Sequence, residues 1–567
     1  MNLFRKIFDI NPKIIIIFIC IFFIFSWFRY GQIYGGGDIG LPLYNPKVSE
    51  SLTRYTWWET QGTGLSYPGV FSSYPFYFIF SLFQRIGFTP LMSQIIFFLS
   101  ILLASGLGMY AFSYYLSKNK TISFFVSLFY LINPYTMMSI WHRFAHTSML
   151  FMAFLPISLL FLSKGLKNKD LKFAFYLAFI SIFGGYSFGT PAFLGTWFFL
   201  IISFWFAYSF QRRFWKSKKF SFYFLLTFFI AWIGFNLWWI LPFFDNAKEV
   251  LFISSSSVGN IENLRGVSRY FKVPFAFRGI NAFYLFEQKD WGDIFANIPF
   301  RILSWFGFFV ILLTFLSKKK PYYFLYFAFL FLISIFISKG SEEPFGEIIV
   351  ISFNLFPSLG VFRNPFEKFG ILMPFSGAYL FGYGIHYFLG IVKTSKRKNL
   401  LYTSLTVFFI GFFVVFHWPL WLGKVFGNMQ HSALVKVPEE YEEASKWFSY
   451  NADDTSRILH LPLALGDGIS YKWEYGYSGL EISQLFFPRS SISHYIGYPL
   501  IDEKYKKIAM SVKEGNWQVF ENLLSSFGVN YIVLHKDVDF NSYLWDSLEN
   551  IENFLDSLPY LKKEKEF

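Results

Sequence analysis

Long apolar blocks dominate the pattern of hydrophobic and polar positions along this chain. One runs from residue 14 to residue 28 and another from 220 to 244, and neither shows the alternation of an amphipathic strand or helix. About 20 residues at helical rise match the hydrocarbon thickness of a bilayer, so blocks of this length predict membrane-spanning helices. The pattern predicts eleven spans, at about 14–29, 91–117, 121–140, 147–163, 173–188, 191–210, 220–243, 301–317, 321–338, 369–392 and 399–418.

Composition supports a polytopic α-helical membrane protein. The chain has 567 residues, of which 54% are hydrophobic and 15% charged. Soluble domains carry about 25% charged residues, so a soluble enzyme and a disordered chain are excluded. The single cysteine, Cys20, lies in the first apolar block. A disulfide-built secreted module is therefore excluded as well.

The charges predict the orientation of the chain in the membrane. One set of short connections carries 21 basic residues and only two acidic ones, Asp9 and Asp170. Basic connections face the cytoplasm. With an odd number of spans, we expect a cytoplasmic N-terminus and an extracytoplasmic C-terminal region in a multi-pass protein of the cell membrane. The net charge of +14 is then a topology signal, and no nucleic-acid partner is expected.

The first apolar block has the basic flank of a signal peptide, but the residues that follow it, Trp27 to Tyr30, offer no small-residue cleavage site. We expect this block to be retained as the first helix.

The polar chemistry is predicted at the outer face. The spans carry almost no ionisable residues, whereas an ion-coupled transporter usually keeps carboxylates at mid-membrane depth. The long outer loops are expected at about 30–90, 134–147, 244–300 and 339–368, followed by the C-terminal region.

Asp38 is the first candidate for catalysis. It follows Gly35, Gly36 and Gly37 and comes about nine residues after the first span, which predicts a position near the membrane surface. Glycines let a backbone turn tightly or approach a ligand closely. A partly desolvated carboxylate there would accept a proton from a hydroxyl, whereas the alternative is a solvated aspartate in a glycine turn. Glu50 and Glu59 are back-ups with weaker context.

At this loop the chain resembles the GT-C superfamily of integral-membrane glycosyltransferases, and within it the AftD-like arabinofuranosyltransferases and the YfhO-like membrane proteins. The resemblance covers the layout of the whole chain and is specific over Gly37–Asp38, Trp141–His146, Phe362–Phe369 and Arg457–Pro462. It implies a polyprenyl-phosphate-linked sugar as donor. It also implies that an acidic residue of the first outer loop is the catalytic base, a role that falls on Asp38.

Such a reaction releases a lipid phosphate, so cations are expected near it. The candidates are Arg143 with His142 and His146, and separately Arg363 and Lys368. Arginine offers phosphate a planar, permanently charged fork. Arg363 has the alternative of snorkelling at the membrane interface. The two histidines, four residues apart, would share a face of a helix and have the alternatives of a weak metal site or plain loop structure.

Further acids and aromatics form a second group of candidates for acceptor binding: Glu59, Trp57, Trp58, Asp290 and Asp293. The tryptophans would stack on a sugar ring or belong to an interfacial aromatic belt. The acidic pair of the 244–300 loop would hold the acceptor or a divalent cation, or form an ordinary acidic turn. The sequence identifies no cofactor with certainty and leaves a divalent cation open.

The chain is expected to divide into a membrane domain, residues 1–418 with the catalytic loop 30–90, and an extracytoplasmic α/β domain, residues 419–567. Charged residues become frequent after residue 418 and the apolar runs shorten to strand length. Strands are predicted at 457–461 and 529–534, and helices from Pro438, at 517–526 and at 541–555 with Asn541 as N-cap.

The sequence thus favours an inverting glycosyltransferase that moves a sugar from a polyprenyl-phosphate donor to an envelope glycan or glycolipid at the outer face, in contact with membrane lipids. One carboxylate is sufficient for inversion. A flippase or exporter of lipid-linked glycans is the chief alternative, but it should carry ionisable residues along its spans. A non-catalytic scaffold with a carbohydrate-binding outer domain is the third.

Overall fold

The computed structural model describes residues 11–58, 62, 64–66, 68–210, 218–245, 261–283, 289–318, 320–426, 433–464, 468–487, 489–494, 499–540 and 547–567. Contacts divide the chain into two compact units. The helical unit comprises Met1–Tyr30 and Ile95–Phe426, and the mixed unit comprises Gly31–Gln94 and Gly427–Phe567. The first loop (residues 31–94) therefore groups with the C-terminal region, whereas the sequence placed it with the membrane helices.

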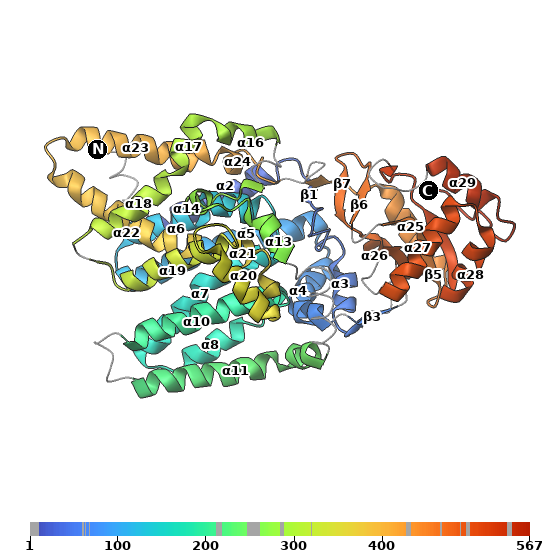
Figure 1. Ribbon diagram of the computed structural model, residues 1–567, viewed down its shortest axis with the longest axis horizontal. Helices are drawn as coiled ribbons and strands as arrows, with labels where there is room; N and C mark the ends of the chain where they lie inside the picture. The colour runs from blue at the N-terminus through green and yellow to red at the C-terminus, as the bar shows by residue number, and fades with distance from the viewer. Residues whose placement is uncertain are drawn as a thin grey trace. The chain divides into compact units, whose positions relative to one another are not determined.

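Helices occupy every block in which the sequence predicts a span (Figure 1). They are α2 (Pro12–Trp27), α5 (Pro90–Ser117), α6 (Lys120–Leu131), α7 (His146–Asn168), α8 (Lys172–Ile180), α9 (Gly185–Phe188), α10 (Pro191–Phe210), α11 (Lys218–Asp245), α17 (Ile298–Ser304), α18 (Phe306–Leu316), α19 (Phe324–Ser338), α22 (Leu372–Thr394) and α23 (Lys398–Ile410). Several blocks are interrupted. Helix α6 ends at Leu131, Ile132 and Asn133 are not helical, and a π-helix, Thr136–Trp141, comes shortly after them. The block at 173–188 is divided into α8 and α9, and the block at 301–317 is divided at Trp305 into α17 and α18.

The helical unit has the composition of a membrane protein. Within the described residues, six helices are long and apolar enough to cross a bilayer: Pro90–Ser117, His146–Asn168, Pro191–Ser209, Lys219–Asp245, Ile298–Leu316 and Lys398–Phe416. Shorter apolar helices add Pro12–Trp27, Lys120–Leu131, Phe324–Ser338 and Gly346–Leu355. The total of eleven spans stays a prediction.

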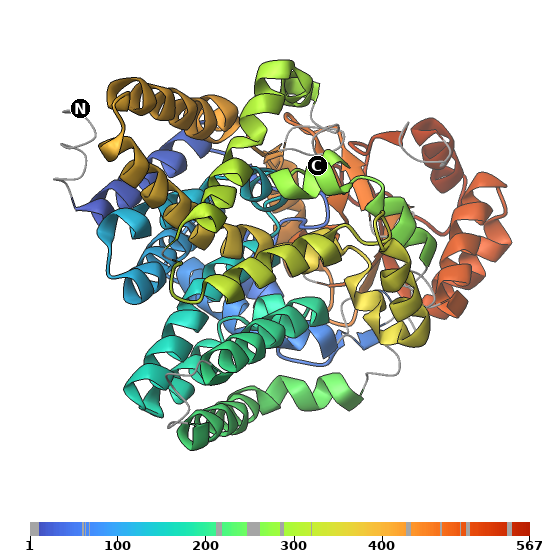
Figure 2. The same ribbon diagram turned by 60° about the vertical axis from the view of Figure 1, so that its left-hand side comes forward.

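Helix α22 forms the centre of the helical unit, in contact with α6, α18 and α19. Glycines make these contacts close, because a methyl group at Gly382 would lie 2.4 Å from Val126 Cγ2, and one at Gly384 would lie 2.0 Å from the carbonyl oxygen of Val310. Small residues allow such close approach of helices in membranes. Helices α7, α8, α10 and α11 lie side by side at one flank of the unit (Figures 1 and 2).

The mixed unit is built on a three-stranded parallel sheet with the order β8–β5–β9. Its strands are β5 (Arg457–Ala464), β8 (Ser490–His494) and β9 (Val529–Leu534). Leu459 of β5 pairs with Ile492 of β8 and with Ile532 of β9. Strands of parallel sheets are usually covered on both faces, and β5 is buried along nearly its whole length. The strands predicted at 457–461 and 529–534 are thus present.

Two cores cover the sheet. One, with Ile458 and Tyr441, packs against α25 (Glu439–Asn451), and the other, with Leu459 and Leu461, packs against α27 (Pro499–Lys513), α28 (Trp517–Phe527) and α29 (Leu548–Asp556). The last helix starts later than predicted, because Ser547 caps it by accepting a bond from the backbone N–H of Asn550. Asn541, the predicted cap, lies outside the described residues.

The first loop supplies its own elements to the mixed unit. Strand β1 (Ile33–Tyr34) pairs with β4 (Leu434–Val435), and β2 (Trp57–Trp58) pairs with β3 (Leu65–Ser66). Helix α3 (Pro46–Leu52) lies between β1 and β2 in the chain, helix α4 (Tyr74–Arg85) comes after β3, and the two helices pack on each other. Leu41 is buried in the same core as Tyr441. The loop is therefore an integral part of this unit.

Candidate functional site

Asp38 lies at the tip of a tight glycine turn in the mixed unit. The backbone N–H of Gly36 donates to the carbonyl of Gly40 over 3.1 Å, and Gly36, Gly37 and Gly40 have φ values of 100°, 55° and 61°. These are left-handed conformations that side chains disfavour, so the glycines around Asp38 are required by the turn itself. The Asp38 side chain is exposed. The predicted base is thus presented on a short, sharply folded piece of backbone.

A strand from the C-terminal region holds this turn. Strand β7 (Tyr477–Leu480) pairs with β6 (Gly468–Tyr471) and continues the pairing to the turn. The N–H of Gly37 donates to the carbonyl of Ser478 over 2.8 Å, and the N–H of Leu480 donates to the carbonyl of Gly37 over 3.0 Å. The residue next to Asp38 is therefore bonded on both its donor and its acceptor side.

Glu50, the back-up base, is engaged by neighbouring side chains in a way that gives it a structural role. Its side chain is 1% exposed, forms ion pairs with Arg54 and Arg85, and accepts a hydrogen bond of 2.7 Å from the Ser81 hydroxyl. Burial opposes its ionisation, but the bonds from Ser81 and Arg54 and the two arginine charges outweigh burial and lower the pKa of Glu50. An ionised carboxylate engaged in this way joins α3 to α4.

The tryptophans predicted to contact sugar lie in the hairpin β2–β3. Trp57 is 55% exposed, and Gly64 makes room for its ring, since a methyl group at Gly64 would lie 2.2 Å from Trp57 Cζ2. Trp58 pairs with Leu65 across the hairpin. Glu59 lies outside the described residues. The hairpin docks on β8, because the N–H of Gly62 donates to the carbonyl of Ser491 over 2.7 Å.

In the helical unit, Arg143 forms an ion pair with Glu367. The arginine side chain is 19% exposed and the glutamate side chain 8%. Glu367 belongs to the short helix α21 (Pro365–Lys368), and the Tyr135 hydroxyl holds this helix by donating to the carbonyl of Phe366 over 2.8 Å. The guanidinium that the sequence assigned to a phosphate therefore has an acidic partner, which the sequence analysis did not find.

His142 and His146 are not on one helix face. His142 ends the π-helix, Phe144 has a left-handed φ of 38°, and a new helix starts at His146. His142 is buried, with Nδ1 3.0 Å from the carbonyl of Val425. Burial and the Arg143 charge lower the pKa of His142 to about 4 against the opposing effect of the Val425 bond, so the ring is neutral at pH 7.

The remaining predicted residues are spread over the helical unit. His146 is buried, its ring 4.6 Å from that of Phe97. Arg363 is exposed just before α21, and the Lys368 ammonium lies 4.9 Å from the centre of the Phe193 ring. Asp293 is exposed on α16 (Lys289–Ala296), and the Asp290 side chain lies outside the described part of the structure.

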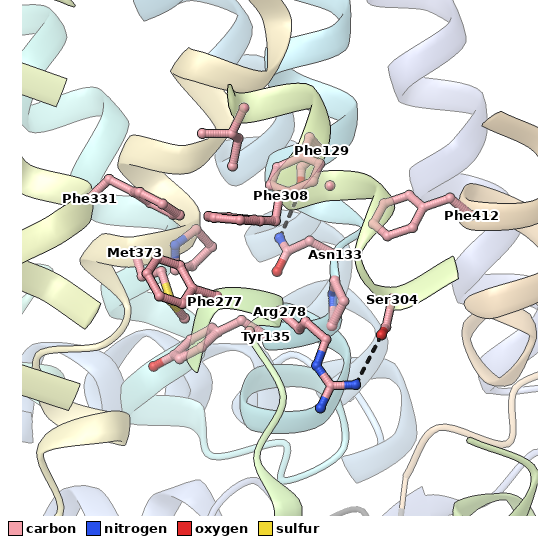
Figure 3. Close-up of a pocket in the computed structure, with 15 residues that line it drawn as sticks. Phe129, Asn133, Tyr135, Phe277, Arg278, Ser304, Phe308, Phe331, Met373 and Phe412 are labelled. Atoms are coloured by element: carbon pink, nitrogen blue, oxygen red, sulfur yellow. Dashed lines mark hydrogen bonds between the residues drawn. The ribbon is translucent and has the colours of Figure 1, made fainter. Parts of the chain in front are cut away.

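An apolar cavity with a cationic edge lies in the same unit. Its volume is about 30 Å³, so it has room for about two water molecules. Figure 3 shows rings of Phe277, Phe308 and Phe331 gathered on one side, and the Arg278 guanidinium on the other, beside Ser304. Arg278 donates to the Ser304 hydroxyl over 3.3 Å and to the carbonyl of Pro274 over 2.9 Å.

Arg278 is a half-buried cation without a carboxylate partner among the residues that the structure describes. Burial, followed by the charge of Arg301, lowers its pKa, and its guanidinium still keeps its charge. Sequence reasoning missed this residue. The available signal was an arginine among the aromatics of Phe275–Arg278, in a predicted outer loop.

Tyr135 joins this cavity to the Arg143–Glu367 pair. It lines the cavity, packs against Gly279, where a methyl group would lie 3.2 Å from Tyr135 Cβ, and bonds to α21. The described residues hold no cluster of three or more His, Cys, Asp or Glu that would suit a metal ion. The chemistry that these residues offer is anion binding by arginine next to apolar walls.

Comparison with known proteins gives a likeness of fold. No family model matches the chain, and no curated protein matches its sequence. The cryo-EM structure of the arabinofuranosyltransferase AftD from mycobacteria is similar, with a TM-score of 0.69 and 13% identity over 98% of this chain and 37% of that chain. A structure of an AftD mutant gives 0.62 and 15% over 93% and 37%.

The oligosaccharyltransferase AglB from Archaeoglobus fulgidus gives a TM-score of only 0.43, at 11% identity. The chain spans 37% of the length of AftD, in an alignment that leaves almost none of its own residues out. The resemblance to AftD that the sequence predicted is confirmed as a likeness of fold.

Proposed function

We propose that this protein is an inverting membrane glycosyltransferase. It moves a sugar from a polyprenyl-phosphate donor to an envelope glycan or glycolipid at the outer face of the cell membrane. The observation that carries the proposal is the fold shared with AftD along 98% of the chain. The chain matches only 37% of AftD. We therefore infer the class of reaction from the shared fold and do not assign the sugar.

In this proposal Asp38 is the catalytic base. Its carboxylate accepts the proton of an acceptor hydroxyl, whose oxygen attacks the anomeric carbon while the bond from that carbon to the phosphate oxygen breaks. The lipid phosphate leaves with the bonding electrons. One carboxylate accounts for inversion. The exposed tip of the glycine turn supports this role, since an acceptor can reach it.

Arginines are proposed to hold the lipid phosphate. The sequence predicts this role for Arg143, Arg363 and Lys368. We add Arg278, because it lacks an acidic partner among the described residues and borders an aromatic cavity. A guanidinium binds phosphate oxygens with two parallel bonds and keeps its charge. His142 contributes no charge, because it is neutral at pH 7.

Replacing Asp38 tests the function. Purified protein in nanodiscs is incubated with a panel of radiolabelled polyprenyl-phosphate sugars and a glycolipid acceptor fraction. The wild type should transfer label from at least one donor, and Asp38→Asn should lower kcat by about 100-fold or more, the usual contribution of a general base. The matched control is Asp556→Asn, which neutralises an exposed acid of the same unit.

Activity of Asp38→Asn within a few-fold of the wild type would reject Asp38 as the base. A wild type that moves labelled donor across the bilayer of a vesicle without transferring sugar would reject glycosyl transfer in favour of a flippase.

A further inference from the structure

We infer that strand β7 of the C-terminal region positions the Asp38 carboxylate, and that Gly479 is the residue through which it does so. The inference rests on the proposed role of Asp38. It makes the C-terminal region part of the catalytic apparatus of this protein, where the sequence suggested a separate domain.

The contact consists of backbone on backbone. The N–H and the carbonyl of Gly37 bond to Ser478 and Leu480, the two neighbours of Gly479, over 2.8 and 3.0 Å. A methyl group at Gly479 would lie 2.4 Å from the nitrogen of Gly37 and 2.6 Å from both the carbonyl carbon and the Cα of Gly36. Atoms in ordinary contact are at least about 3.4 Å apart, so an alanine would overlap the backbone of the turn by about 1 Å.

Glycine is needed at position 479 for space alone. Gly479 is outside the left-handed region of φ, whereas Gly36 and Gly37 are inside it. An alanine at 479 therefore has an allowed backbone conformation, and its single defect is the overlap with the turn.

Strand β7 is held more firmly than the turn. It is paired with β6 over four residues, the Tyr477 hydroxyl donates to the carbonyl of Leu480 over 2.6 Å, and the Tyr477 ring is buried in the core of the unit. The turn contains three glycines and an exposed tip. An added methyl group should therefore displace the turn, and Asp38 with it, by an appreciable part of an ångström.

Such a displacement is large on the scale of catalysis. A misplacement of about 1 Å at a reacting group can lower a rate by about 100-fold. Catalytic groups are typically held to within about 0.5 Å. The two bonds to β7 hold the backbone of the turn that carries Asp38.

The experiment compares Gly479→Ala with Gly468→Ala in the full-length protein. Gly468 lies across the same hairpin from Leu480, its φ is also outside the left-handed region, and a methyl group there meets only the carbonyl of Gly479 at 3.7 Å. Gly479→Ala should lower kcat by about 10- to 100-fold, with the KM for the donor within a few-fold of the wild type. Gly468→Ala should leave both constants unchanged.

Two further readouts separate positioning from general damage. Hydrogen exchange of the Gly37 and Leu480 amides should speed up in Gly479→Ala while the amides of β5 and β9 stay protected. In an Asp38→Asn background, Gly479→Ala should cause no additional loss, because a residue that acts through Asp38 has nothing left to position.

Wild-type kcat in a folded Gly479→Ala protein overturns the inference, and so does an additive loss in the double variant. Should Gly479→Ala fail to fold, Tyr477→Phe removes one anchor of β7 and keeps the ring; a kcat lowered about threefold supports the inference and an unchanged kcat overturns it. An active Asp38→Asn protein would instead refute the proposed base, and an inactive Asp38→Asn with a fully active Gly479→Ala would refute only the positioning.

Discussion

The ion pair between Arg143 and Glu367 lies in the helical unit. Replacing these residues should have different effects on the free energy of unfolding and on the binding of the lipid-linked donor. The side chains are 19% and 8% exposed, so both charges have lost most of their water. At contact distance and an effective dielectric constant of about 20, the attraction amounts to about 4 kcal/mol. Removing one partner of such a pair usually costs about 3–5 kcal/mol, since the other charge stays buried.

The variants are Arg143→Gln, Glu367→Gln and the combination of the two. Arg143→Gln should cost about 3–5 kcal/mol, because the carboxylate that it leaves is nearly inaccessible to water. Glu367→Gln should cost less than Arg143→Gln, because a fifth of the arginine side chain remains exposed and can be hydrated. The double variant should cost about 2–4 kcal/mol less than the sum of the single ones, the signature of a direct interaction.

Unfolding in mixed micelles, followed by titration with SDS, gives the free energies for this cycle. Transfer assays at saturating acceptor give the KM for the lipid-linked donor. If Arg143 holds the donor phosphate, Arg143→Gln should raise that KM about tenfold or more, corresponding to about 1.4 kcal/mol, and Glu367→Gln should not. A coupling energy below about 1 kcal/mol would refute the burial argument. If the KM of Arg143→Gln equals that of the wild type, Arg143 does not bind the donor and its role is the ion pair with Glu367.

Two further predictions concern separate parts of the molecule. Arg278→Gln should raise the KM for the lipid donor about tenfold or more while kcat at saturating donor stays within a few-fold, and Arg265→Gln, an exposed change, should alter neither. The mixed unit should weaken in acid. Burial, followed by the charge of His535, lowers the pKa of His460 to about 3, so below pH 6.5 the unfolded chain takes up a proton that the folded one refuses. Protection of the β5 and β9 amides from exchange should fall by about 2 kcal/mol from pH 7.5 to pH 5, and equal protection at both values would contradict this.

Much of the fold follows from local sequence signals. Apolar blocks of bilayer length indicated the helices, and Asn133 and Pro134 come shortly after the end of α6 at Leu131. Strand β9 reads as a short apolar run, and Gly528, with a φ of 62°, ends α28 where the sequence placed the end of a helix. These features depend on neighbours in the chain, which is why a single sequence reveals them.

No local sequence signal indicated that the first loop groups with the C-terminal region. Strands β1 and β4 have two residues each and lie about 400 residues apart in the chain. No periodicity of residues marks a two-residue strand, and the partner is chosen by the tertiary structure. The same limit applies to Glu367, whose pairing with Arg143 joins segments more than 200 residues apart.

Only part of the candidate site could be predicted from the sequence, because only its local features leave a signal there. The glycines around Asp38 indicated a tight turn, because a left-handed backbone selects glycine locally. The role of Glu50 depends on Arg85 in another helix, and the neutral state of His142 depends on the burial of its ring. Arg278 has no acidic side chain beside it among the described residues, and only the three-dimensional structure can reveal this.

The mixed unit cannot be regarded as a module formed by residues 427–567 alone. Leu41 of the first loop is 3% exposed in a core whose other buried residues, such as Tyr441 and Ile458, come from the C-terminal region. A fully buried leucine contributes about 1.5–3 kcal/mol, comparable to a large share of the net stability of a domain. Residues 427–567 without the first loop would lack this side chain and the strand that pairs with β4. The backbone that carries Asp38 is therefore the same backbone that completes the C-terminal fold, so the two must form together.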